Sequence, residues 1–235
     1  MEDKYYLAAL LQCRQIGSVR MRRLCAAVSE AQEIWAMSAA ALRATGILSD
    51  ALADDLARHI QAHPNLPERI AADCAHTDVS IITIDDELYP VVLREIFDPP
   101  LVLYYRGVLV PDARRIGMVG ARKFTAYGEA AAMEFAERIA AAGVTIVSGA
   151  ARGIDTRAHR GALRGGRTVA VLGCGVDVAY PSENRRILAQ IAETGGAVIS
   201  EYAPGTQPLP VFFPARNRII SGLSEGTLVV EAAQR

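Results

Sequence analysis

The sequence predicts an α/β fold in which a small all-helical domain precedes a parallel β-sheet covered by helices on both faces. Two observations predict it. From residue 116 onward, short apolar runs rich in β-branched residues alternate with amphipathic helical stretches, the pattern of βαβ units. Residues 5–60, in contrast, are rich in Ala and Leu and lack the alternation of strands. A chain of 235 residues can bury one good-sized core and a small second domain.

The first domain is predicted to span residues 1–76. Within it, residues 5–60 predict four or five short helices packed as a small bundle. The segment 63–67, which contains two prolines, is the most linker-like part of the chain, and a last helix at 68–76 follows it.

Two features of this first domain are candidate binding sites. The turn Gly17-Ser18-Val19 has two interpretations, a contact of its backbone amides with nucleic-acid phosphate or a plain turn between helices. His59 and His63 are spaced as metal ligands can be, but Pro64 ends the helix and no third ligand is near in sequence. We therefore expect no metal site.

The second domain is predicted to span residues 77–235. Its first two strands, at 79–84 and 101–105, enclose a short helix and extend one edge of the sheet. Five strands follow, at 116–119, 144–148, 168–172, 197–200 and 227–231, and helices alternate with them at 126–142, 154–164, 182–194 and 214–223. Right-handed crossovers bring every strand-to-helix turn of such a sheet to one edge.

Charge and cysteine content limit the classes of protein to which this chain can belong. Residues 1–113 carry 10 Lys and Arg against 16 Asp and Glu, whereas residues 114–235 carry 15 against 10, so the second half is basic. The four cysteines lie far apart without a C-x-x-C pair, which favours reduced thiols. The polar start and the lack of an 18-residue apolar run predict a cytoplasmic protein without a membrane segment.

The turns at the predicted sheet edge combine glycines with basic side chains. Gly120 leaves room for the backbone of a ligand to approach, and the guanidinium of Arg122, two residues later, is suited to grip a phosphate. The basic residues within reach of this edge are Arg122, Lys123, Arg152, Arg157, Arg185, Arg186, Arg216 and Arg218. Successive turns carrying such charges suit a chain of phosphates better than a single one.

The individual arginines differ in interpretation. Arg122 is predicted to face the ligand, together with Arg185 or Arg186. Arg152 either contacts the ligand or pairs with the nearby Asp155. The same alternative holds for Arg216 and Arg218, whose candidate partners are Glu201, Glu225 and Glu231. The aromatic residues Phe124, Tyr127 and Tyr180 beside these turns can stack on bases or pack into the core.

Enzymatic function is the competing interpretation. Asp155, Asp177, Glu201 and Glu231 fall at or just after strand ends, and His159 lies nearby, so an acid/base pair can be drawn. However, the sequence contains no nucleophile elbow, no P-loop and no G-x-G-x-x-G fingerprint. We therefore expect carboxylates that neutralise arginines, no bound NAD, ATP or other cofactor, and no enzymatic activity.

Five motifs in order carry a family resemblance. They are VGAR at 119–122, SGAARGID at 148–155, LGCGVD at 172–177 with Tyr180-Pro181 and Asn184, SEY at 200–202 with Pro204-Gly205, and FPARNRIISGLS at 213–224. In these motifs the chain resembles the DprA/Smf family of DNA-processing proteins over about residues 78–235, and the helical start resembles the SAM-like module of many members.

The resemblance implies an extended Rossmann-like fold that binds single-stranded DNA without turnover. It implies that the protein protects incoming DNA during natural transformation and loads the RecA recombinase. Gly120 and Arg122 match the family's DNA anchor, and Arg185 or Arg186 matches a further basic position. Arg216 and Arg218 match residues that shape the same pocket.

The sequence also departs from the family pattern. It stops at Arg235, where members continue with further strands, so we expect a fragment whose Rossmann-like part is truncated. A homodimer and the contact with RecA depend in the family on that later part. The alternative is a nucleotide-processing enzyme like the related phosphoribohydrolases, but their Pro-Gly-Gly-x-Gly-Thr segment does not occur here.

Overall fold

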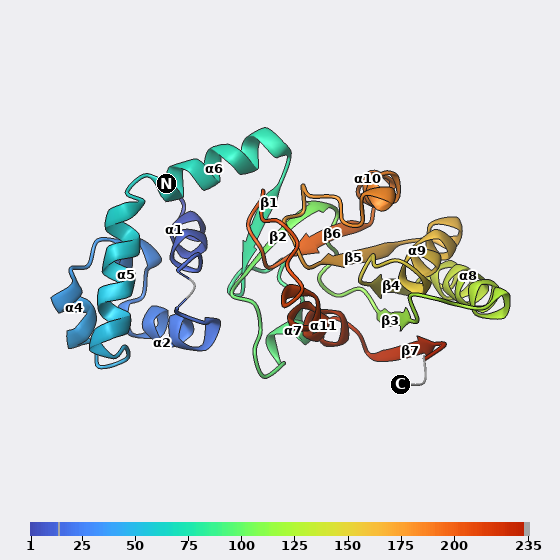
Figure 1. Cartoon of the computed structure of the whole chain (residues 1–235), viewed down its shortest axis with the longest axis horizontal. Coiled ribbons are helices and arrows are strands. Elements are labelled where there is room, and N and C mark those ends of the chain that lie inside the picture. Colours follow the sequence, from blue (N-terminus) through green and yellow to red (C-terminus); the bar gives the residue numbers. More distant parts are fainter. Residues whose placement is uncertain (14, 233–235) are drawn as a thin grey trace.

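The computed structural model describes residues 1–13 and 15–232, so that residues 233–235 of the predicted second domain lie outside the described residues. A group of helices forms one end of the molecule, and a sheet with its covering helices forms the other (Figure 1). Among the described residues, no helix combines the length and the apolar character needed to cross a membrane.

The predicted helical start is confirmed. Five helices precede residue 63: α1 (Asp3–Leu10), α2 (Ser18–Val28), α3 (Ala31–Trp35), α4 (Ala39–Ala44) and α5 (Asp50–Ala62). Ser38 and Ser49 cap α4 and α5, since each hydroxyl accepts a hydrogen bond from an N–H in the first turn of its helix. The linker is shorter than predicted, because α6 (Leu66–Thr77) takes Pro67 into its first turn, where the missing N–H of proline costs no hydrogen bond.

One seven-stranded sheet follows. Its strands are β1 (Ser80–Thr83), β2 (Val102–Gly107), β3 (Arg115–Gly120), β4 (Thr145–Ser148), β5 (Thr168–Leu172), β6 (Ala197–Ser200) and β7 (Gly226–Val230). The order across the sheet is β1-β2-β6-β5-β4-β3-β7. The last five strands in sequence are parallel, as predicted, and β1 and β2 extend the edge beside β6.

The sheet is mixed rather than wholly parallel, which refines the prediction. β1 pairs with β2 and β2 pairs with β6 in antiparallel fashion. The chain between β1 and β2 turns back through a loop and the short helix α7 (Val91–Arg94). An antiparallel edge on an otherwise parallel sheet is common in α/β proteins.

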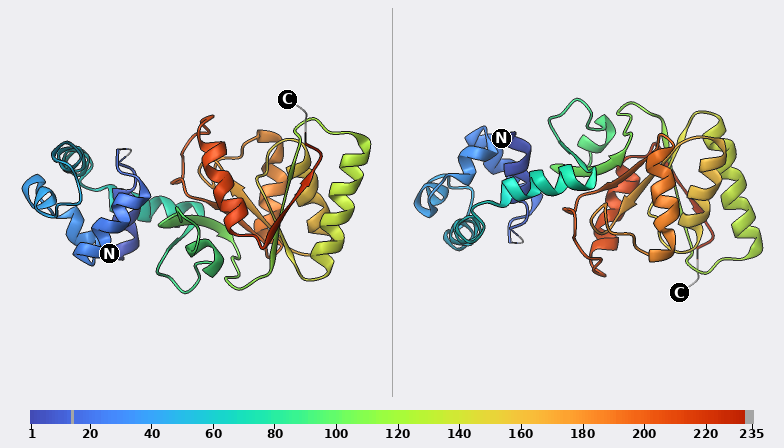
Figure 2. Two further views of the ribbon diagram at one scale, coloured as in Figure 1. Left: turned by 90° about the horizontal axis from the view of Figure 1, so that it is seen from below. Right: turned by 90° about the horizontal axis from the view of Figure 1, so that it is seen from above.

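The helices of this part cover both faces of the sheet (Figure 2). Helices α8 (Ala126–Ala141), α9 (Ile154–Gly165) and α10 (Arg185–Glu193) pack beside one another on one face, with the 3-10 turn η1 (Ser182–Asn184) leading into α10. Helix α11 (Phe212–Gly222) returns across the other face to β7. All four positions agree with the predicted helices to within a few residues.

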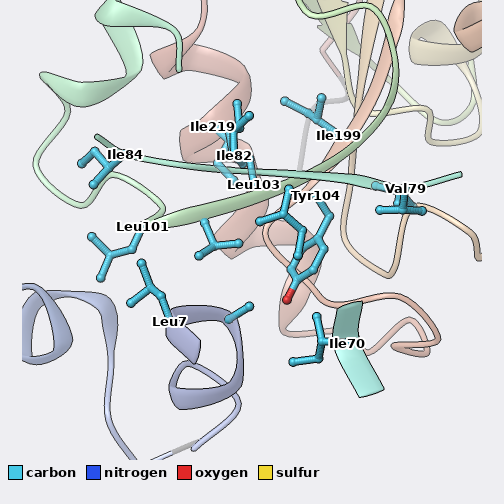
Figure 3. Close-up of a cluster of buried hydrophobic side chains, with 14 of the residues drawn as sticks. Leu7, Ile70, Val79, Ile82, Ile84, Leu101, Leu103, Tyr104, Ile199 and Ile219 are labelled. Atoms are coloured by element: carbon cyan, nitrogen blue, oxygen red, sulfur yellow. The ribbon is translucent and has the colours of Figure 1, made fainter. Parts of the chain in front are cut away.

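Two apolar clusters hold these layers together. The larger one is continuous from the helical start into the sheet: Leu7 of α1 and Ile70 of α6 pack against Leu101, Leu103 and Tyr104 (Figure 3). Full burial of a side chain of this size contributes about 1.5 to 3 kcal/mol. The predicted division at residue 76 falls in the last turn of α6, and its status as a domain boundary stays a prediction.

The smaller cluster joins α8 and α9 to β3 and β4. Met118 and Ile146 of the strands meet Ile154 and a row of alanines from the two helices. Gly161 of α9 lies where a Cβ would overlap the carbonyl oxygen of Met133, so the two helix backbones are in close contact. This packing fixes the amino end of α9 against the carboxyl end of β3.

Candidate nucleic-acid interface

A groove of about 990 Å³ lies between the carboxyl ends of β3, β4, β5 and β7 and helix α11. Its charged lining comprises four arginines and two carboxylates, Arg122, Arg152, Arg216, Arg218, Asp155 and Glu231. Of the predicted site residues, the structure brings together Gly120, Arg122, Arg152, Arg216 and Arg218, and leaves Lys123, Arg185 and Arg186 outside the lining. The parallel strands thus place their turns on one edge, as the topology predicts.

The turn that carries Arg122 is fixed by close backbone contacts. A Cβ on Gly120 would overlap the carbonyl oxygen of Val230 and come within 2.8 Å of the Ile154 side chain. Gly153 has φ +96°, and a Cβ there would lie 2.6 Å from the Cα of Arg122. Both glycines are therefore required by the close approach of neighbouring backbone.

Glu231 holds the same turn from β7. Its carbonyl oxygen accepts a hydrogen bond from the Ala121 N–H (2.8 Å), and its Oε2 accepts one from the Thr125 N–H (2.9 Å). Thr125 in turn caps α8 by accepting from the Gly128 N–H (3.0 Å). The Arg122 side chain projects from this rigid turn into the groove, exposed and without an ion pair to any described residue.

The floor of the groove is formed by Gly149, Asp155 and Arg216, which are buried. Arg216 is only 4% exposed, and its Nη1 donates to the carbonyl oxygens of Gly149 (2.7 Å) and Val171. The Oδ2 of Asp155 accepts from the N–H groups of Gly149 (3.2 Å) and Ala151 (3.4 Å). Arg216 is thus committed to carbonyl groups rather than to a predicted carboxylate partner.

The pKa values of the two charged floor residues, Asp155 and Arg216, are shifted in opposite directions. Burial raises the pKa of Asp155, and the positive charge of Arg216 opposes part of that rise. Burial lowers the pKa of Arg216, and repulsion from Arg122, which lines the same groove, adds a smaller lowering. The two arginines therefore belong to one positive region.

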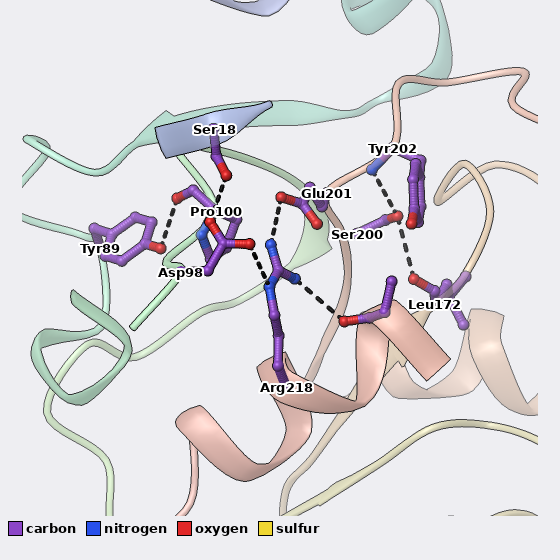
Figure 4. Close-up of polar contacts among 10 residues, drawn as sticks. Ser18, Tyr89, Asp98, Pro100, Leu172, Ser200, Glu201, Tyr202 and Arg218 are labelled. Carbon is purple, nitrogen blue, oxygen red and sulfur yellow. Dashed lines mark hydrogen bonds and ion pairs between the residues drawn. The ribbon is translucent and has the colours of Figure 1, made fainter. Parts of the chain in front are cut away.

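Arg218 is held by two carboxylates (Figure 4). Its Nη2 donates to Glu201 (2.7 Å) and its Nε to Asp98 (3.4 Å), while the other oxygen of Asp98 accepts from the hydroxyl of Ser18 in α2. Burial alone lowers the pKa of Arg218, but the bonds to Glu201 and Asp98 outweigh it and leave the pKa raised. Of the partners considered for Arg218, the structure selects Glu201; Glu225 pairs with Arg114 instead.

The rim of the groove comprises Arg122 and Arg152, which are exposed; Lys123, Arg185 and Arg186 are exposed as well but lie outside the lining. Arg152 pairs with Glu183 (2.5 Å) and not with Asp155, which is turned inward. Arg185 and Arg186 are the first two residues of α10, directly after η1. Asn184 fixes this start of α10, because its Nδ2 donates to the Ala150 carbonyl oxygen (2.8 Å).

The residues considered for acid/base catalysis are occupied in holding the fold. Asp177 accepts from the Gly205 N–H (2.9 Å), and Asp155, Glu201 and Glu231 have the partners described above. His159 is fully buried and its pKa is lowered to about 3 by burial and by the charge of Arg216. The Thr168 hydroxyl donates to Ile146 O (2.8 Å), so His159 Nδ1–H must donate to Thr168 (2.8 Å).

The aromatic residues near the groove have separate roles. Tyr180 is 44% exposed and lies 5.3 Å from Phe213, ring centre to ring centre, and both line the groove. Phe124 is covered by the Arg157 guanidinium at 4.9 Å, while Tyr127 is 80% exposed on α8. The sequence prediction did not include Phe213 among the aromatic residues of the site, although Phe213 is the first residue of the motif at 213–224 that contains Arg216.

Metal binding was also considered for the helical part. His59 Nε2 bonds to the Ala9 carbonyl oxygen (3.0 Å), and its ring lies 5.1 Å from that of His63. Within residues 1–13 and 15–232, no three His, Cys, Asp or Glu side chains are grouped as a metal ion would require.

Comparison with known proteins gives matches over most of the chain. The sequence model of the family described as DNA recombination-mediator protein A matches residues 80–235. Protein Smf of Synechocystis is 38% identical over 240 residues, covering 98% of this chain and 58% of that protein. DNA processing protein DprA of Bacillus subtilis is 39% identical over 178 residues, covering 74% of this chain and 59% of its own length. The chain thus spans between half and two thirds of these relatives.

Solved structures give the same result. The X-ray structure of DNA processing protein A from Streptococcus pneumoniae superposes with a TM-score of 0.77 at 32% identity, over 100% of this chain and 80% of that one. The structure of DNA processing protein A from Helicobacter pylori superposes with a TM-score of 0.59 at 28% identity, over 68% of this chain and 73% of that one. The latter work describes the single-stranded DNA binding mode of the Helicobacter protein.

Proposed function

Because the chain belongs to the DNA recombination-mediator protein A family, we propose that its groove binds single-stranded DNA and that it does so without chemical turnover. The family predicted from the five sequence motifs is confirmed by these matches.

The exposed guanidinium of Arg122 is the observation that carries the proposal. It stands on a turn fixed by close backbone contacts, in the groove that Arg216 also lines, whereas the Arg152 and Arg218 of the same lining are held in ion pairs. A preformed cation without a partner among the described residues is ready to accept a phosphate with two charge-assisted hydrogen bonds. Beyond the lining, Lys123 follows Arg122, and Arg185 and Arg186 follow the Asn184 that bonds to Ala150. All three are exposed and would serve a longer polyanion.

A single strand suits this groove better than a duplex. Tyr180 and Phe213 lie beside the arginines, and unpaired bases stack on such rings whatever their sequence. Bases inside a duplex are already stacked and paired, so that only the phosphates would be available. The Helicobacter relative, described by its single-stranded DNA binding mode, supports the same ligand.

The absence of turnover is part of the proposal. The carboxylates at the strand ends are bound to N–H groups or arginines, and His159 is buried away from the groove. A phosphoribohydrolase would need an acid or base directed at the ligand. None of the residues considered for that role is directed in this way: Asp155, Asp177, Glu201, Glu231 and His159.

The wider role is proposed for the whole protein, of which this chain matches a part. The family resemblance supports protection of incoming DNA in natural transformation and loading of RecA onto it, with a homodimer as the possible assembly. Such a role places the protein in the cytoplasm, which is the localisation that the sequence predicts.

Fluorescence anisotropy with single-stranded and double-stranded oligonucleotides, titrated over a salt series, tests the proposal. We expect tighter binding of the single strand and a logarithm of affinity that falls with the logarithm of salt by about 0.7 for each phosphate contact. Nucleotides incubated with the protein should yield no product. Affinity that is independent of salt, or equal for duplex and single strand, would contradict the proposal.

A further inference from the structure

A second, smaller hollow of about 200 Å³ lies between α2 and the segment that leads into β2. Arg22, Arg23 and Phe97 surround it, and Pro99 and Leu101 give it an apolar wall. We propose that this hollow is a further contact for single-stranded DNA, where a base stacks on Phe97 and a phosphate binds Arg22 or Arg23. The inference rests on the proposed function, because it extends the path of the same strand.

Phe97 is the first observation behind the proposal. Its side chain is 98% exposed, whereas phenylalanine is among the residues most often buried in folded proteins. A ring that contributes nothing to the core can be retained as a surface for stacking. A base of any kind can stack on an exposed aromatic side chain, because every base has a flat π-face.

The charge around the ring is the second observation. Residues 1–113 are acidic as a whole, but no Asp or Glu occurs between Lys4 and Ser29. Arg20, Arg22 and Arg23 are exposed on α2, and none of them forms an ion pair with the residues that the structure describes. Unpaired guanidinium groups beside an exposed ring form the combination that single-strand binding proteins use.

The third observation is an ion pair that links the hollow to the groove. Asp98 lines the hollow and accepts a hydrogen bond from Ser18 of α2, while its second oxygen pairs with Arg218 (Figure 4). Arg218 in turn lines the groove. Asp98 and Arg218 thus join the two hollows, and Arg218 shares its charge between Asp98 and Glu201.

The length dependence of binding tests this inference. Affinities are measured by anisotropy for oligothymidylates from about 4 to about 20 nucleotides. We expect Phe97→Ala to weaken binding of the longest by at least about fivefold and to leave the shortest unchanged. Arg22→Ala/Arg23→Ala should do the same and should also reduce the salt slope by about 0.7, the value for one lost phosphate contact.

The matched control is Arg160→Ala/Arg164→Ala on α9, which changes the net charge equally at two exposed positions outside both hollows. It should bind every length like the wild type. A Phe97→Trp variant adds a direct readout, since stacking of a thymine on the new indole quenches its fluorescence with long oligonucleotides.

Two outcomes would overturn the inference. Variants at Phe97 and at Arg22/Arg23 that bind all lengths like the wild type would show that the hollow makes no contact. A loss of equal size at every length would show that it does not extend the groove. If Arg122→Ala weakens binding in the same experiment, only this inference fails; if the wild type binds no oligonucleotide, the proposed function fails instead.

Discussion

The floor and the rim of the groove place the same side chain in opposite environments. On the floor, Arg216 is buried and donates to two backbone carbonyl groups, so its charge is used to hold β4, β5 and α11 together. On the rim, Arg122 is exposed, has no described partner and stands on a turn that other residues fix. In this groove, therefore, a buried arginine maintains the fold, whereas an exposed arginine is available to a ligand.

Removal of Arg216 should have the largest effect. Arg216→Ala leaves the buried carbonyl groups of Gly149 and Val171 without their donor, and it removes the charge that opposes the rise in the pKa of Asp155. We therefore expect a loss of about 3 to 5 kcal/mol in the free energy of unfolding. Urea denaturation followed by circular dichroism measures it. Arg122→Ala is the control and should change stability by less than about 0.5 kcal/mol. Equal losses would remove the distinction between floor and rim.

Gly153 lies where floor and rim meet. Its replacement should cause the second largest loss in the free energy of unfolding. Gly153→Ala puts a Cβ against the Ala121 carbonyl oxygen and the Cα of Arg122 at a positive φ, which we expect to cost about 2 to 4 kcal/mol. Gly143→Ala is the matched control, because Gly143 also has a positive φ but nothing within 4 Å of the added Cβ. It should cost only about 1 kcal/mol. Similar melting temperatures for the two variants would contradict the packing described for the Arg122 turn.

His159 beneath the floor should make stability depend on pH. Its pKa is lowered to about 3 in the folded protein, so between that value and about 6.5 the unfolded chain binds a proton that the folded protein does not. The free energy of unfolding should therefore fall as the pH is lowered through this range, by up to about 1.4 kcal/mol per pH unit.

Unfolding at a series of pH values measures this dependence. Burial also lowers the pKa of His59, which contributes in the same direction, so the comparison is made with His159→Gln. The variant should show the smaller slope. A slope that the substitution does not change would mean that His159 is not the group responsible.

The smallest effect is expected on the rim. Glu183→Gln removes the charge that pairs with Arg152, and we expect a few-fold gain in affinity for single-stranded DNA and no change in stability, because the pair is exposed. Anisotropy at low salt is the suitable measurement. A weaker complex would show that Glu183 positions Arg152 for binding instead of competing with the phosphate.

The sequence predicted the elements and the edge where the site lies, because both depend on local patterns. Apolar runs located the strands, and a parallel topology alone brings Gly120 and Arg152 to one edge. The return from β1 to β2 could not be oriented in this way, since a short loop and helix are compatible with either direction.

Side-chain partners were predicted less well, because they depend on contacts distant in sequence. Arg218 bonds to Asp98, 120 residues away, and Arg152 pairs with Glu183 although Asp155 is nearer along the chain. Spacing along the chain contains no information on such distances in space. The exposure of Phe97 was likewise not predictable, because an isolated phenylalanine before a loop is ordinarily part of a core.

The claim that Arg122 binds DNA without maintaining the fold has one most direct test. It is the affinity of Arg122→Ala for an unstructured oligonucleotide, measured together with the free energy of unfolding of the variant. We predict a loss of at least about 1 to 3 kcal/mol in binding, the range for a charge-assisted phosphate contact, with stability unchanged. Equal binding by the wild type and the variant would contradict the assignment of Arg122 as the anchor of the DNA strand.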